Sequence, residues 1–116
     1  SQSRILVMGT TFKENVSDIR KSRVIDVIDE LRSFGINQID VMDPHASAKE
    51  IKEEYDIDLV NGDDGPYDAL ILAVPHKEYA NLSEKDFLAK TSDGAFFVDV
   101  KGIYRDKINQ LDYWSL

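Results

Sequence analysis

The sequence has no cysteine, only three prolines and six glycines among 116 residues, and fewer basic than acidic side chains. The lack of cysteine excludes disulfides, thiolate zinc sites and a cysteine nucleophile. The longest apolar runs, 69–74 and 95–98, are far shorter than the roughly 18 residues that a membrane-spanning helix needs. A net charge of −8 argues against broad contact with nucleic acid or anionic lipid. We therefore expect one globular domain that binds neither nucleic acid nor a membrane.

The charge is unevenly distributed along the chain. Residues 1–23 carry five basic and two acidic side chains, a balance of +3, whereas residues 26–64 carry twelve acidic and three basic ones, a balance of −9. A positive segment on an acidic body fits a site that steers a small anion. Chance scatter of surface charge gives the same numbers, so the charge pattern leaves both interpretations open.

Hydrophobic patterning predicts strands that alternate with helices. Short apolar runs predict strands at 4–8, 39–42, 69–74 and 96–98, and a marginal strand at 57–60. We expect residues 69–74 to lie at the centre of the sheet, because they form the most apolar run of the chain. The Asp93-Gly94 pair predicts a turn, and residues 111–116 are apolar enough to dock as a final element or to be buried elsewhere.

Helical spacing of apolar residues predicts a helix from Val24 to a stop at Phe34-Gly35, with Ser22 or Asp18 as its cap. Capping residues predict two further helices, which begin after Ser47 and Ser83. The alternation predicts an α/β fold with three layers: an open, mostly parallel sheet with helices on both faces. The fold is Rossmann-like but lacks the GxGxxG fingerprint.

The longest connection after a predicted strand, residues 9–22, is the first candidate site. In an open parallel sheet, ligands bind beyond the carboxyl ends of the strands. This connection exceeds the usual two to six residues, carries several cations, and leads into a helix N-terminus that favours phosphate. It matches neither the dinucleotide fingerprint nor the P-loop. Phe12 either stacks on a base or packs as a loop anchor, and Lys13 is either a ligand or a solvated lysine.

Further alternatives concern charged residues that follow the strands. Asp18 and Arg20 either pair with each other to clasp the loop or contact a ligand. Lys101 follows a later strand at the same sheet edge, where it either clamps a diphosphate together with Lys13 or neutralises Asp99.

The two histidines, His45 and His76, each follow a predicted strand and a proline. Either one is a candidate general base. We favour turn-forming roles, because no cysteine or serine partner stands at a recognisable spacing. Two separated histidines also make a poor zinc site.

Four motifs in a fixed order give the chain a family resemblance. They are Gly9-x-x-Phe12-Lys13, Asp18-x-Arg20-x-Ser22, Asp43-Pro44 and Asp99-x-Lys101. With them the chain resembles the C-terminal, UDP-binding domain of the UDP-glucose/GDP-mannose dehydrogenase family. Asp99-Val100-Lys101-Gly102 and the terminal Tyr113-Trp114-Ser115-Leu116 are most similar to the bacterial UDP-N-acetylhexosamine 6-dehydrogenases of polysaccharide synthesis.

The resemblance implies a cytoplasmic enzyme that oxidises the C6 hydroxyl of a UDP-sugar to a carboxylate in two NAD-dependent steps, through a thioester on a cysteine outside this domain. Residues 1–116 are then a single UDP-sugar-binding domain and the C-terminal part of a longer chain, as the start without methionine also suggests. NAD is bound mainly by the absent N-terminal domain, and the absent central domain forms a homodimer. The fragment alone holds no catalytic residue, cofactor or metal and is expected to be inactive.

The resemblance also assigns residues. Phe12 and Lys13 contact the substrate near its diphosphate, and Lys101 replaces an arginine that helps to hold the UDP-sugar. Four residues support the loop: Gly9, Asp18, Arg20 and Ser22.

Other classes of protein fit less well. A free-standing nucleotide-binding or regulatory module remains the alternative. A signalling receiver domain needs an acidic pair where this chain has Gly9-Thr10, and a self-contained hydrolase needs a nucleophile and base that the sequence does not pair.

Overall fold

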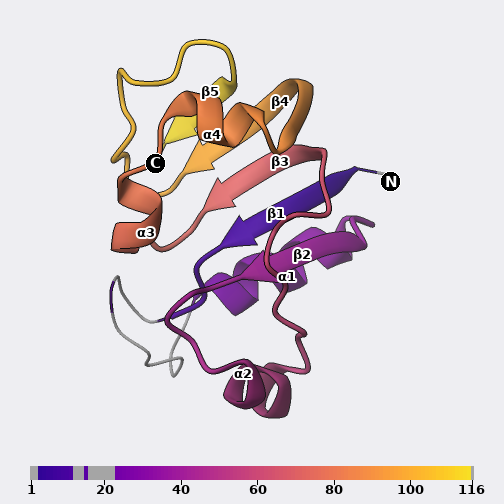
Figure 1. The fold of residues 1–116 in the computed structure, drawn as a ribbon. Helices are drawn as coiled ribbons and strands as arrows, with labels where there is room; N and C mark the ends of the chain where they lie inside the picture. Colours follow the sequence, from indigo (N-terminus) through magenta and orange to yellow (C-terminus); the bar gives the residue numbers. More distant parts are fainter. Residues whose placement is uncertain (1–2, 12–14, 16–22, 116) are drawn as a thin grey trace.

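The computed structural model describes residues 3–11, 15 and 23–115, and its centre is a parallel sheet of five strands (Figure 1). The strands are β1 (Arg4–Met8), β2 (Gln38–Met42), β3 (Tyr67–Leu72), β4 (Thr91–Asp99) and β5 (Asp112–Ser115). They lie in the order β2-β1-β3-β4-β5, and every neighbouring pair is parallel. The predicted parallel α/β sheet is confirmed, and the most apolar strand, β3, is central as expected.

The described residues form four helices, and all but the third begin close to where the sequence places them. They are α1 (Val24–Ser33), α2 (Ala48–Tyr55), α3 (Lys77–Ala80) and α4 (Glu84–Leu88). The Ser47 hydroxyl accepts a hydrogen bond from the Glu50 N–H at the start of α2, and Ser83 forms a capping box at the start of α4. The helix α1 begins after Arg23, which provides no side-chain cap. The predicted caps Ser22 and Asp18 lie outside the described residues.

Each face of the sheet carries its own apolar core. On one face, Phe87 of α4 and Tyr79 of α3 pack with Leu70 and Phe97 of the sheet. On the other face, α1 and α2 contribute buried isoleucines that pack with the alternate residues of β1 and β3. Helices therefore cover both faces, as predicted. None of the helices in the described ranges has the length and apolar character to cross a membrane.

Three local features differ from the expectation. Residues 57–60 form no strand, because only Leu59 pairs, through an isolated bridge to Val41. Asp93-Gly94 lies within β4 rather than between elements, at the place where the register against β3 shifts. Gly94 has a φ of +74°, so the strand bulges there and continues. The short helix α3 was not predicted, whereas residues 112–115 dock as the edge strand β5, in agreement with the sequence.

Candidate functional site

Polar residues follow β1, β2 and β3 at the edge of the sheet where these parallel strands end. Thr10 and Thr11 follow β1, Asp43 follows β2 and His76 follows β3. Thr10, Thr11 and His76 are buried, and the side chain of Asp43 is fully buried although its backbone is partly exposed. Gly9 lets the chain turn toward β3: its φ is +100°, and a Cβ there would lie 2.6 Å from the Cβ of Val74. Only glycine fits this position without displacing the backbone of its neighbour.

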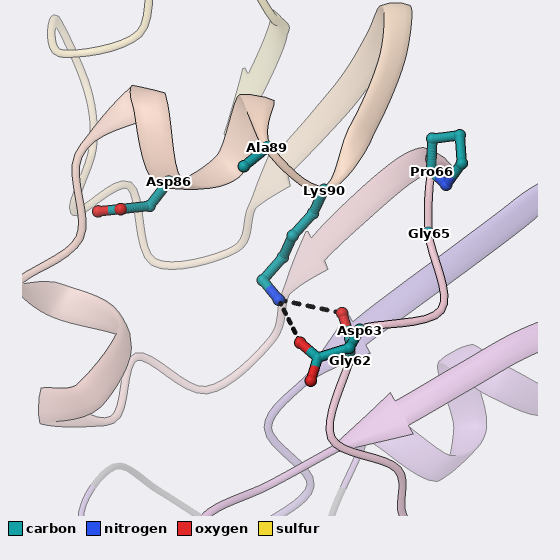
Figure 2. Close-up of a pocket in the computed structure, with 7 residues that line it drawn as sticks. All are labelled: Gly62, Asp63, Gly65, Pro66, Asp86, Ala89 and Lys90. Atoms are coloured by element: carbon teal, nitrogen blue, oxygen red, sulfur yellow. Dashed lines mark hydrogen bonds and ion pairs between the residues drawn. The ribbon is translucent and has the colours of Figure 1, made fainter.

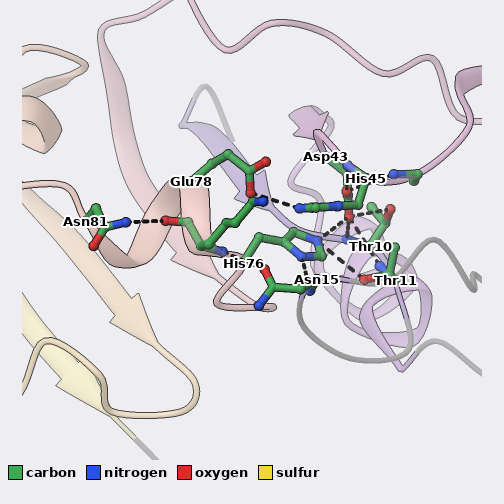
Figure 3. Close-up of polar contacts among 10 residues, drawn as sticks. Thr10, Thr11, Asn15, Asp43, His45, His76, Glu78 and Asn81 are labelled. Carbon is green, nitrogen blue, oxygen red and sulfur yellow. Dashed lines mark hydrogen bonds and ion pairs between the residues drawn. The ribbon is translucent and has the colours of Figure 1, made fainter.

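The Asp43 carboxylate is the centre of this polar cluster (Figure 3). Its Oδ2 accepts hydrogen bonds from the N–H groups of Thr10 at 2.6 Å and Thr11 at 3.3 Å, and from the Thr10 hydroxyl at 3.1 Å. Its Oδ1 accepts from the N–H groups of His45 at 2.7 Å and Ala46 at 3.0 Å. Burial alone raises the pKa of a carboxyl, but the hydrogen bonds from His76, Thr10 and His45 outweigh it and lower the pKa of Asp43. Asp43 is therefore ionised at neutral pH.

His76 connects this carboxylate to the connection that follows β1. Its Nε2 lies 3.0 Å from Asp43 Oδ2 and 3.3 Å from Thr11 Oγ1. Its Nδ1 accepts a hydrogen bond from the Asn15 N–H at 2.8 Å, and Asn15 Oδ1 accepts one from the Lys77 N–H at 2.7 Å. Because Nδ1 is an acceptor and Nε2 faces a carboxylate, the proton of the ring is assigned to Nε2.

His45 packs against His76 and is the more exposed of the two histidines. His45 Nε2 is 2.8 Å from Glu78 Oε1, and the rings of His45 and His76 have centroids 4.4 Å apart. Both histidines lie in turns, as the sequence suggests. The His76 carbonyl accepts hydrogen bonds from the N–H groups of Tyr79 and Ala80 at the start of α3. Their side chains in addition tie three strand ends together. Within the ranges that the structure describes, no three His, Asp or Glu side chains are arranged to hold a metal ion.

Lys101 lies beyond β4 at the same edge of the sheet, and its side chain is exposed. The buried Asp99 carboxylate accepts hydrogen bonds from the N–H groups of Gly102 at 3.0 Å and Tyr104 at 2.7 Å, and from the Tyr113 hydroxyl at 2.6 Å. Asp99 therefore fixes the backbone around Lys101. Lys101 forms no ion pair with Asp99 or any other described residue, which does not support the interpretation that it neutralises Asp99.

The end of β4 is two strand positions from the end of β1, a distance of about 10 Å. The predicted site residues Phe12, Lys13, Asp18, Arg20 and Ser22 lie outside the described residues. Gly9 and Lys101 are the two predicted residues that the structure places, and they lie at the same edge.

A hollow of about 370 Å³ lies at the other edge of the sheet, where β3 and β4 begin (Figure 2). Lys90 is its cation, and its ammonium group donates to the Gly62 carbonyl at 3.0 Å and lies 3.6 Å from the Asp63 carboxylate. Because the charge of Lys90 is already paired, and because ligands of such sheets bind at the opposite edge, this hollow is a weaker candidate.

Comparison with known proteins identifies the family of the chain. Residues 6–106 match the model of the UDP-glucose/GDP-mannose dehydrogenase family, UDP binding domain. The chain is 44% identical over 85 residues to the UDP-N-acetyl-D-glucosamine 6-dehydrogenase of Pseudomonas aeruginosa, which is 72% of this chain and 20% of that enzyme. It is 37% identical over 105 residues to the protein CapL of Staphylococcus aureus, covering 89% of this chain and 24% of that protein.

The fold also agrees with a solved structure. The UDP-N-acetyl-mannosamine dehydrogenase Cap5O of Staphylococcus aureus superposes with a TM-score of 0.74 and 24% identity, over 99% of this chain and 26% of that one. The chain thus spans about a quarter or less of the length of the relatives it matches. With a family model that covers most of its length, the chain belongs to the UDP-glucose/GDP-mannose dehydrogenase family, as its UDP binding domain.

Proposed function

We propose that this chain binds the UDP moiety of a UDP-N-acetylhexosamine for an NAD-dependent dehydrogenase that oxidises the C6 hydroxyl of the sugar to a carboxylate. The observation that carries the proposal is the 44% identity to an enzyme named UDP-N-acetyl-D-glucosamine 6-dehydrogenase. Lys101 at the C-terminal edge supports it, because Lys101 has no acidic partner among the described residues and a diphosphate needs positive charge at that edge. In this proposal Lys13 and Lys101 hold the diphosphate, Phe12 contacts the nucleotide, and Gly9, Asp18, Arg20 and Ser22 shape the loop.

The remaining parts of the reaction belong to polypeptide outside residues 1–116. The domain has no cysteine, so the thioester nucleophile lies elsewhere. NAD does not fit here: Asp43 stands after β2, where dinucleotide-binding folds place the acid that binds the ribose, but its oxygens already accept bonds from five backbone or hydroxyl donors and His76. We therefore assign NAD to the preceding domain of a cytoplasmic, homodimeric enzyme and expect the isolated domain to be inactive.

Calorimetric titration of the domain with UDP tests the proposal, with AMP and inorganic phosphate as competing ligands. We expect UDP to bind with higher affinity than either. Lys13→Ala and Lys101→Ala should each weaken UDP binding at least tenfold, because a hydrogen bond from a charged group contributes about 1.5–3 kcal/mol.

Lys107→Ala is the matched control, since Lys107 is an exposed lysine of the same connection and its loss changes the net charge equally. Equal loss of affinity in all three variants would indicate general attraction of an anion and contradict the assigned site. Equal affinity for AMP and UDP would favour the alternative, a nucleotide-binding module without specificity for uridine.

A further inference from the structure

We propose that the uncovered face of β4 and β5 beside α1 is the docking surface of an amphipathic helix, supplied by the dehydrogenase polypeptide outside residues 1–116. The proposal rests on the function proposed above, which assigns NAD and the thioester nucleophile to that polypeptide. It adds which face of this domain the remaining polypeptide contacts and the chemistry of the segment that makes the contact.

The sheet face that carries α1 and α2 is covered only in part. Phe97 of β4 belongs to the core of the other face, so its neighbours Phe96 and Val98 point to the side of α1. Tyr113 of β5 packs on Phe97, so Trp114, the register partner of Val98, points to the side of α1 as well. Figure 1 shows α1 and α2 near β1 and β2. Among the described residues no helix covers this part of the face, and Phe96 and Trp114 are 47% and 57% exposed.

The side of α1 that is turned toward β4 is also apolar. Val27, Leu31 and Phe34 follow one another at intervals of four and three residues, so they lie along one side of the helix. Arg32 lies on the other side, close enough to Asp56 at the end of α2 for their charges to interact. The apolar side therefore faces away from α2, toward β4. Four large apolar side chains among the described residues are exposed, and all of them border this one surface: Val27, Phe34, Phe96 and Trp114.

This surface ends in a hollow of about 390 Å³ at the edge where the strands begin. Its apolar lining includes Ile5, Ile36, Ala69 and Phe96. Ser3 lines the same hollow, so the polypeptide that leads into β1 passes this end of the surface. A helix laid over β4 and β5 antiparallel to the strands, as α1 is, ends at the hollow and close to the entry into β1.

The dimensions and the family of the domain both favour a helix from the same polypeptide. Neighbouring strands are about 4.8 Å apart, so β4 and β5 together offer about the 10 Å width of one helix. Doubly wound sheets bury both faces under helices. The matched region makes up only 20% to 26% of the relatives, so most of such an enzyme is polypeptide outside this domain.

A second copy of this chain fits the surface less well. The side of α1 that points away from the sheet carries Asp26, Glu30 and Ser33, all exposed. If the α1 of a second copy lay on Phe96 and Trp114, these polar groups would lose water without gaining partners. Each copy also has a net charge of −8, so two copies repel each other.

The rim of the surface indicates the charge of the docking helix. Asp93 lines the hollow, and Asp112 is the register partner of Phe96 on β5. Both are exposed, and neither forms an ion pair with another described residue. A helix that ends beside these carboxylates is stabilised by Lys or Arg in its last turn, which also suits the negative end of the helix dipole. We therefore expect an apolar helix face that ends in basic residues.

Hydroxyl-radical footprinting of the isolated domain and of the full-length polypeptide tests the proposal. Mass spectrometry gives the oxidation rates of Phe96 and Trp114, which rise with the exposure of each side chain. In the full-length polypeptide we expect both rates to be about fivefold lower than in the isolated domain, because the core of an interface is fully buried. Tyr55 on α2 is the internal control, and its rate should not change.

One substitution and its matched control test the contact itself. In the full-length polypeptide, Trp114→Lys should return the oxidation rate of Phe96 to that of the isolated domain, because a charge replaces an apolar contact. Gln110→Lys adds the same charge at an exposed position whose N–H binds Glu84 of α4, and it should leave Phe96 protected. Phe96 that stays protected in Trp114→Lys would contradict the proposal.

The wild-type footprint decides the proposal without any variant. Equal oxidation of Phe96 and Trp114 in the two wild-type proteins would overturn it. Protection in the isolated domain that disappears on dilution would assign the surface to a second copy, which also overturns it. Titration with UDP keeps the two proposals apart. Protection without UDP binding contradicts the proposed function, whereas UDP binding without protection contradicts the docking surface.

Discussion

Replacement of Asp43 by asparagine is the most direct test of the polar cluster at the ends of β1, β2 and β3. The carboxylate accepts on both oxygens, three bonds from Thr10 and Thr11 and one from His76 on Oδ2, and two from N–H groups on Oδ1. An asparagine has one acceptor oxygen and one NH₂ group. Whichever way the amide turns, its NH₂ group faces N–H donors whose hydrogen bonds the carboxylate oxygen accepts in the wild type.

We estimate the destabilisation by Asp43→Asn from the orientation of the amide that loses fewer hydrogen bonds. With the amide oxygen at the Oδ2 position, the NH₂ group faces the N–H groups of His45 and Ala46, which lie 2.7 and 3.0 Å from Oδ1 in the wild type. Each bond to a charged group contributes about 1.5–3 kcal/mol, and the Asp43 side chain is fully buried. We therefore expect Asp43→Asn to lower the free energy of unfolding by about 3–6 kcal/mol, a large part of the 5–15 kcal/mol of a typical domain.

Urea unfolding followed by far-UV circular dichroism measures this difference. Asp63→Asn is the control, because its exposed carboxylate pairs with Lys90 only at 3.6 Å and should contribute less than about 1 kcal/mol. A loss below 1 kcal/mol for Asp43→Asn would refute the reasoning.

The decrease of the free energy of unfolding at acidic pH gives a second test of the same substitution. Because the folded protein lowers the pKa of Asp43 below 3.8, the stabilisation is complete above that pKa and is lost as the pH falls below it. The variant has no such group, so its stability should decrease less steeply below pH 4. Equal slopes for the two proteins would contradict the assigned protonation of Asp43.

Two further substitutions test the supports of the site. Gly9→Ala should lower the free energy of unfolding by more than about 2 kcal/mol in urea titrations. The reason is that its Cβ would lie 2.8 Å from the Val74 backbone nitrogen, at a φ of +100°. A variant as stable as wild type would show that the backbone of residue 9 does not approach Val74 in this way. Tyr113→Phe should cost about 1.5–3 kcal/mol, since the hydroxyl donates to the Asp99 carboxylate at 2.6 Å. It should also weaken UDP binding through the loop of Lys101, whereas Tyr55→Phe on α2 should leave UDP affinity unchanged.

The sheet could be predicted from the sequence because its signals are local. The run Arg4-Ile5-Leu6-Val7-Met8 coincides with β1, and the stripe that begins at Val24 coincides with α1. Signals that depend on distant partners failed. Asp93-Gly94 has the composition of a turn, but pairing with β3 before and after it, at Thr91 and Phe96, keeps both residues within β4. The α3 helix of four residues is too short to show a period.

The sequence predicts where the members of the cluster around Asp43 lie along the chain, but not the hydrogen bonds between them. Asp43-Pro44 marks the end of a strand, and His76 follows another, but the hydrogen bonds between them join residues 33 positions apart. A usable signal existed: three predicted strands are each followed within four residues by a buried polar side chain, Thr10, Asp43 and His76. Parallel strands bring such residues to one edge, so their convergence follows from the topology once the strand order is known.

The hydrogen-bond partners of two acidic residues are consistent with the anion site proposed above for a protein of net charge −8. Two carboxylates stand at the C-terminal edge of the sheet, and each is bound by N–H and O–H groups: Asp43 by the ends of β1 and β3, Asp99 by the turn after β4 and by β5. Among the described residues, N–H and O–H dipoles rather than lysines therefore surround both carboxylates. Lys101 has no acidic partner among the described residues, as its proposed contact with a diphosphate requires. We therefore expect the local arrangement at the strand ends, more than the net charge, to decide whether an anion binds there.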